Sequence, residues 1–268
     1  MTICLAAICE KGDKVIMASD SMLTSPSLSI EFEIKSPKLE ELCENCAIAT
    51  AGDALVHTEL VEETALTINH MKSPTVTQVV DSIKKSYATL RQRKIVETIL
   101  QPKGFESMAD FYDRQRHILP EIAMTIQRAI DRYDYGLEIL VGGVDTRAHI
   151  HAVVNPGTSA PFDSLGHAAI GSGYPHATTS FIANEYHQDF PLGRALLVAY
   201  EAKKISEKAP GVGSNLTNMC VISKNAVRML TDADIKKLDQ VYRGKIEEQT
   251  KLLQGRDWAK ELGGMLND

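Results

Sequence analysis

Two short apolar runs at the start of the chain constrain its fold most. Ile3–Cys9 carries no charge, and Lys14–Ser19 is apolar between its first and last residues. Runs this short and this continuous predict strands that are buried on both faces, because a half-exposed strand would alternate with polar residues. The polar, glycine-containing link Glu10-Lys11-Gly12-Asp13 predicts that these two strands form a hairpin.

The remaining patterns group strands and helices into blocks along the chain. Further strands are expected near 37–51, 137–154, 166–170 and 216–230, and helices over about 54–133, 175–204 and 231–254. This order predicts an α+β protein in which two antiparallel sheets pack between helix layers, a four-layer αββα sandwich. The 268 residues are taken as a single domain, 1–268.

Composition excludes several classes of function. The formal charge of −6 gives no electrostatic footprint for nucleic acid. No apolar run approaches the ~20 residues that span a bilayer, so no membrane association is expected. The first residues lack the basic flank and the cleavage site of a signal peptide, which favours a cytoplasmic location.

No metal or organic cofactor is expected. Cys43-Glu44-Asn45-Cys46 has zinc-ligand spacing, but the sequence holds no second cysteine pair. His149-Ile150-His151 places two imidazoles on one face of a predicted strand, as a metal site would use, but no third ligand is evident. Disulfides are not expected in the cytosol.

The Met1-Thr2 start suggests a nucleophile. Methionine aminopeptidases cut before a residue as small as threonine, and cleavage would leave Thr2 with a free α-amine beside its own hydroxyl. The amine titrates near ~8, so it can take the hydroxyl proton directly or through a water. Many proteins start with these two residues and have no such activity.

Four more residues stand at the joints of the predicted elements. Asp20 closes the second strand, Lys38 precedes the third, and Gly52 follows the fourth. Ser172 lies in Gly171-Ser172-Gly173, between a strand and a helix. Together with Thr2, these residues in this order resemble the proteasome β-subunit family of N-terminal nucleophile hydrolases.

The resemblance implies a catalytic role for each of the five residues. Thr2 would attack the substrate carbonyl, the Lys38 ammonium would stabilise the alkoxide, and Asp20 would keep that lysine charged and oriented. The Gly52 amide would bind the oxyanion, an interaction worth ~3 kcal/mol in comparable enzymes. Ser172 would position the α-amine or its water.

The same resemblance implies substrate-binding residues. Thr24 would hold the substrate backbone. Leu23, Thr50 and Ala54 would line a pocket for a modest apolar side chain.

The sequence also departs from the family pattern. Lys35 is an alternative for the catalytic lysine, although Lys38 fits the spacing to Gly52 better. After the helix that ends near Lys204, family proteases carry an Asp and then a Ser. Here Ser206 or Glu207 stands near the first place, and Ser214 only loosely matches the second.

Two further departures are a helical insertion at about 90–130 and the extra C-terminal helix at about 231–254. The insertion is amphipathic. It is expected either to pack on its own domain or to form a lid or an altered subunit interface.

The resemblance therefore predicts a threonine-dependent amide-bond hydrolase, a peptidase that works through an acyl-enzyme on Thr2. It implies a peptide or protein substrate and a homo-oligomer built as a ring or as stacked rings. A transpeptidase or ligase with the same nucleophile and a non-catalytic, proteasome-like assembly subunit are the alternatives. Whether a regulatory ATPase takes part stays open.

Overall fold

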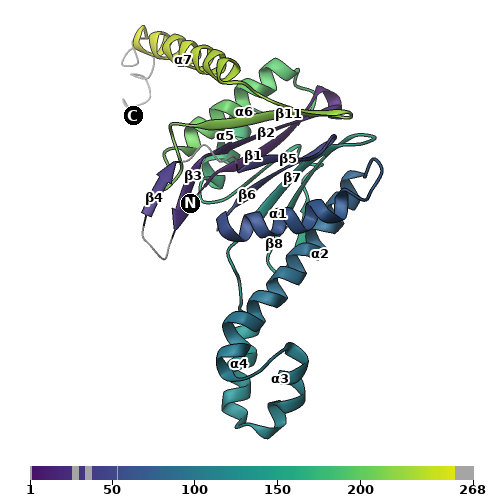
Figure 1. Cartoon of the computed structure of the whole chain (residues 1–268). Helices are drawn as coiled ribbons and strands as arrows, with labels where there is room; N and C mark the ends of the chain where they lie inside the picture. The colour runs from purple at the N-terminus through teal and green to yellow at the C-terminus, as the bar shows by residue number, and fades with distance from the viewer. Residues whose placement is uncertain (1, 26–29, 34–37, 53, 257–268) are drawn as a thin grey trace, which may run out of the picture.

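The computed structural model describes residues 2–25, 30–33, 38–52 and 54–256. These residues form an α+β structure with two five-stranded antiparallel sheets (Figure 1). The α+β class expected from the sequence is thus confirmed.

The strands fall into two large sheets and one small hairpin. Their bounds are β1 (Cys4–Cys9), β2 (Lys14–Asp20), β3 (Met22–Ser25), β4 (Ile30–Glu33), β5 (Leu39–Cys43), β6 (Cys46–Ala51), β7 (Glu138–Val144), β8 (Ala148–Val154), β9 (Thr158–Pro161), β10 (His167–Ile170), β11 (Thr217–Ser223) and β12 (Ala226–Met229). The first sheet has the order β10-β1-β2-β11-β12, the second has the order β5-β6-β7-β8-β9, and β3 pairs with β4.

The described residues also form seven α-helices, several of which begin at recognisable caps. They are α1 (Ala54–Ile68), α2 (Val76–Ile95), α3 (Met108–Arg114), α4 (Pro120–Asp131), α5 (Tyr174–Ala183), α6 (Leu192–Ser206) and α7 (Asp232–Gln254). Thr75 and Gln78 form a capping box at the start of α2. Thr231 and Asp234 do the same for α7, which occupies the range expected for the C-terminal helix.

Strand β1 is apolar throughout because each of its faces lies in a different core. One set of its side chains packs between the two sheets (Cys4, Ala6, Ile8), and the other packs toward α5 and α6 (Leu5, Ala7, Cys9). Burial on both faces removes the polar alternation that a half-exposed strand would show. The hairpin with β2 follows the predicted turn.

Helices cover the outer faces of both sheets. Side chains of α5 and α6 share a core with the outer face of the first sheet, and side chains of α1 and α2 share one with the second sheet. A third core lies between the sheets. This layer order is compatible with the predicted four-layer sandwich.

The insertion forms an arm, residues 95–133, with a core of its own. Figure 1 shows α3 and α4 at the far end of α2, away from the sheets. The buried side chains of the arm pack on one another (Ile95, Leu100, Phe105, Phe111, Ile126, Ile130).

Within the described part of the chain, no helix has both the length and the apolar character that crossing a membrane requires.

Phe111→Ala is expected to unfold the arm and to leave the sheets folded. Phe111 is fully buried, and its ring meets that of Phe105 edge-on at 5.3 Å. Removing a buried aromatic costs ~3–5 kcal/mol, a large loss for so small a core. Hydrogen exchange should show lost protection in α3 and α4 and unchanged protection in β1.

Tyr112→Ala is the matched control, because the neighbouring Tyr112 is 45% exposed. It should leave exchange in the arm nearly unchanged. Loss of protection in both sheets of the Phe111 variant would show that the arm does not fold as a separate unit.

Candidate functional site

The carboxylate of Asp20, at the end of β2, is fully buried and gathers two of the predicted catalytic side chains. Its Oδ1 accepts hydrogen bonds from Lys38 Nζ at 3.0 Å and from Thr2 Oγ at 3.2 Å. The amide of Ile3 donates to the same oxygen at 3.2 Å. Lys38 and Thr2 are themselves only 6% and 3% exposed, so the hydroxyl and the ammonium bind this carboxylate in a site with little water.

The second carboxylate oxygen of Asp20 holds the loop that precedes β11. Oδ2 accepts from the amide of Gly213 at 2.8 Å and from that of Met22 at 3.3 Å. The Gly213 loop is fixed in turn by Lys203 of α6, which is fully buried and donates to the Gly213 carbonyl at 3.1 Å. Burial lowers the pKa of Lys203, and the ion pair with Glu207 at 2.6 Å opposes this shift.

Ser172 meets the backbone of Thr2, as the resemblance implies. The Thr2 nitrogen donates to Ser172 Oγ at 3.2 Å, and the Gly173 amide donates to the Thr2 carbonyl at 3.1 Å. Gly171 has a φ of +84°, and a Cβ on it would stand 2.4 Å from the Thr2 carbonyl oxygen. This loop approaches the first strand so closely that only glycine fits there.

Gly52 lies at the end of β6 in another close approach of two backbones. Its φ is +128°, and a Cβ would stand 1.9 Å from the carbonyl oxygen of Gly136. The residue therefore offers backbone and no side chain to its surroundings, as an oxyanion-binding glycine would.

A cavity of ≈550 Å³ joins these parts. Three of the predicted catalytic residues line it (Thr2, Gly52, Ser172), together with Ala51, Asp134, Gly136, Leu137, Glu138, Val154, Asn155, Gly171 and Tyr174. Asp20 and Lys38 are buried and do not line the cavity, but Asp20 contacts both Thr2 and Lys38. The tertiary structure thus brings all five residues to one place.

No protein-family model matches the chain. A search of curated proteins also finds no match. The geometry of the site therefore carries the functional interpretation.

None of the predicted substrate-binding residues is found among the described residues that line the cavity. Thr50 is buried, its amide donates to the Lys38 carbonyl at 3.1 Å, and the neighbouring Ala51 lines the described cavity in its place. The side chains of Leu23, Thr24 and Ala54 lie outside the described residues.

The structure also locates the residues that stand near the Asp and Ser positions of the family pattern. Ser206 is buried and contacts the Gly173 carbonyl at 3.2 Å, on the inner side of the Ser172 loop. Glu207 pairs with Lys203, and Ser214 is exposed. The rival Lys35 lies outside the described residues.

The sequence did not predict that the segment after the arm would line the cavity. Asp134 and Gly136 follow the arm directly, and both line the cavity. Glu138 begins β7, and its Oε2 accepts from the Gly171 amide at 2.8 Å. The one available signal was a carboxylate at the start of an otherwise apolar strand.

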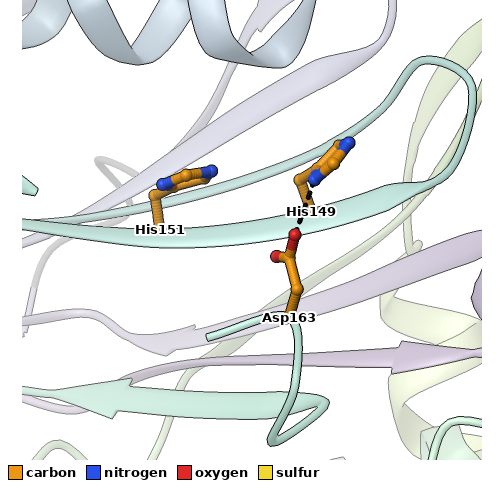
Figure 2. Close-up of side chains that lie close together, drawn as sticks. All are labelled: His149, His151 and Asp163. Carbon is orange, nitrogen blue, oxygen red and sulfur yellow. Dashed lines mark hydrogen bonds and ion pairs between the residues drawn. The ribbon is translucent and has the colours of Figure 1, made fainter. Parts of the chain in front are cut away.

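A second polar cluster lies outside this cavity. His149 and His151 project from the same side of β8, and Asp163, from the segment after β9, reaches His149 (Figure 2). The sequence indicated the two histidines but not the carboxylate, because only the path of the chain after β9 brings it there. Among the described residues, Cys43 and Cys46 belong to no cluster of three metal-ligating side chains.

Asp20→Asn is expected to lower the free energy of unfolding by ~3–5 kcal/mol. It leaves the buried Lys38 ammonium without its countercharge, and breaking a buried ion pair from one side has this cost. Urea denaturation followed by circular dichroism measures the change.

Asp81→Asn is the control. Asp81 pairs with Lys84 at 3.1 Å on the surface, with side chains 62% and 38% exposed. An exposed pair contributes little, so a change within ~0.5 kcal/mol is expected. Equally small changes in both variants would contradict the structural role assigned to Asp20.

Proposed function

We propose that this chain is a threonine-dependent amide-bond hydrolase of the N-terminal nucleophile type, which acts on peptides once Met1 has been removed. One observation carries the proposal. Thr2 Oγ and Lys38 Nζ bind the same oxygen of Asp20, beside a cavity that Thr2 itself lines.

The reaction would begin with proton transfer within Thr2. The Thr2 hydroxyl gives up its hydrogen bond to Asp20 Oδ1 and passes its proton to the freed α-amine, directly or through a water. The contact between the Thr2 nitrogen and Ser172 Oγ at 3.2 Å supports a fixed place for that amine. The Lys38 ammonium lowers the cost of the negative charge on Oγ, and Asp20 holds the ammonium in place. Neither group has to leave the interior.

The oxygen of Thr2 would then attack the substrate carbonyl carbon. The Gly52 amide binds the oxyanion that forms, and the position of Gly52 in the cavity wall supports this role. When the C–N bond breaks, the leaving amine takes the proton held by the Thr2 α-ammonium. Water then hydrolyses the ester and restores Thr2.

The proposal includes the fold and the assembly implied by the proteasome β-subunit resemblance. Two antiparallel sheets with helices on both outer faces are compatible with that fold. A homo-oligomeric ring belongs to the same proposal. Its test is the molar mass in solution.

Labelling with an electrophile selective for N-terminal threonine tests the proposed function. After Met1 removal, confirmed by intact mass, peptide mapping should place one adduct on Thr2. Lys38→Ala should abolish labelling because the alkoxide loses its neighbouring positive charge. Lys14→Ala is the matched control, since Lys14 also stands at the start of a strand but far from Asp20 in the sheet register, and labelling should persist.

Two outcomes contradict the enzyme. One is failure of correctly processed protein to label, and the other is unchanged labelling in folded Lys38→Ala. A chain that retains Met1 would have no free threonine amine and would favour the non-catalytic assembly subunit.

The cavity wall also predicts a preference for basic side chains in the substrate. The described lining includes the carboxylates of Asp134 and Glu138 and has no Lys or Arg. In Glu138→Gln, the amide oxygen can still accept from Gly171, but the charge is lost. The ratio of kcat/KM for a Lys-containing peptide over a neutral one should fall about fivefold, the size expected of a partly exposed charge pair worth ~1 kcal/mol.

Glu62→Gln, on the exposed side of α1, serves as the control and should leave this ratio unchanged. An unchanged ratio in Glu138→Gln would exclude the carboxylate from substrate selection. It would leave the role of Thr2 unaffected.

A further inference from the structure

We propose that His149, His151 and Asp163 bind one divalent transition-metal ion of the zinc type. Each residue offers a ligand atom, and these atoms all lie within 4.8 Å of one another. Figure 2 shows both imidazoles on one side of β8, with the Asp163 carboxylate directed at His149. The site is separate from the Thr2 cavity and does not depend on the proposed function.

The backbone fixes the three ligands before any ion binds. His149 and His151 alternate with Ile150, whose side chain packs between the sheets, so the imidazoles share the opposite face. The Ile150 amide donates to Asp163 Oδ1 at 2.9 Å. The other carboxylate oxygen, Oδ2, lies 2.7 Å from His149 Nδ1. Gln188 holds the Asp163 carbonyl at 2.8 Å.

The unpaired ring nitrogen of His151 favours a metal over a simple hydrogen-bonded cluster, and the contacts of His149 are compatible with one. Nδ1 of His151 is buried and has no hydrogen-bond partner among the described residues, which is costly unless a ligand satisfies it. Nε2 of His149 lies 3.3 Å from Asp145 Oδ1. Metal-binding histidines characteristically direct their second ring nitrogen at such a carboxylate, which fixes the tautomer and the ring orientation.

The donor set selects the class of metal. Two imidazoles and one carboxylate are ligands that suit Zn²⁺, and three protein ligands leave a fourth position for water. Tetrahedral bonds of ~2.1 Å place ligand atoms about 3.4 Å apart. Binding would therefore open the 2.7 Å contact between His149 Nδ1 and Asp163 Oδ2 and draw the other ligand atoms, which lie within 4.8 Å, to this separation. The side chains of His149 and Asp163 are 15% and 26% exposed, which leaves an entry path.

The ion would link β8 to the segment after β9, at the edge of the second sheet. Val154 on the same strand lines the Thr2 cavity, but it lies three residues from His151, or about 10 Å along the strand. The metal therefore takes no part in chemistry at Thr2. Its effect is to stabilise the sheet edge.

Calorimetric titration of the full chain with Zn²⁺ tests the site and should give one ion per chain. At a hundredfold excess of free Zn²⁺ over the dissociation constant, Tm should rise by about 5 °C. His151→Ala and Asp163→Asn remove a ligand and should each weaken binding by at least about tenfold. Asp145 contacts the cluster through Nε2 of His149 and also accepts from the Val76 amide. Asp145→Asn should weaken binding by about tenfold, with circular dichroism confirming that α2 is retained.

His187→Ala is the matched control for adventitious binding. His187 is 60% exposed and lies 3.8 Å from Asp189, a surface His–Asp pair with no third ligand among the described residues. Binding should persist in this variant. Absence of stoichiometric binding, or binding unchanged in His151→Ala and Asp163→Asn, overturns the proposal.

X-ray absorption of zinc-loaded wild type tests the ligand set even if a variant fails to fold. Scattering from two imidazoles around the ion is expected. A spectrum without imidazole scattering overturns the site.

Discussion

The buried carboxylate of Asp20 is the contact on which three separate segments of the chain converge. It accepts hydrogen bonds from the first residues, from the lysine that precedes β5 and from the loop before β11, as well as from the nearby residue that opens β3. A carboxylate taken out of water costs several kcal/mol unless donors and a countercharge replace its hydration. The segments must therefore come together on folding, and this brings a hydroxyl and an ammonium to one carboxylate oxygen.

Two close contacts between backbone segments complete the site around Asp20. Gly171 lies against the Thr2 carbonyl, and Gly52 lies against that of Gly136, at distances that leave no room for a side chain. The second approach joins the end of β6 to the exit of the arm, so the arm shapes one wall of the cavity. Arg91 strengthens this link, since it donates to the carbonyls of Ile130 and Tyr133 and to the Asn155 side chain.

Strand β8 connects the two sites that we propose. Its last residue and the following Asn155 border the Thr2 cavity, while His149 is its second residue and His151 its middle one. An ion bound to those histidines would fix the strand to the segment after β9. The two proposed sites thus share a strand and have separate chemistry.

The sequence by itself determined the features that local rules control. The apolar run of β1 predicts burial on both faces, and the catalytic candidates Asp20, Lys38, Gly52 and Ser172 stand at the joints of predicted elements. Only the tertiary structure decided that Lys203 fixes the loop onto Asp20, that Glu138 reaches the Thr2 cavity and that Asp163 completes the histidine pair. Each of these contacts depends on sheet register and on the path of a loop, and neither is encoded in the spacing or periodicity of nearby residues.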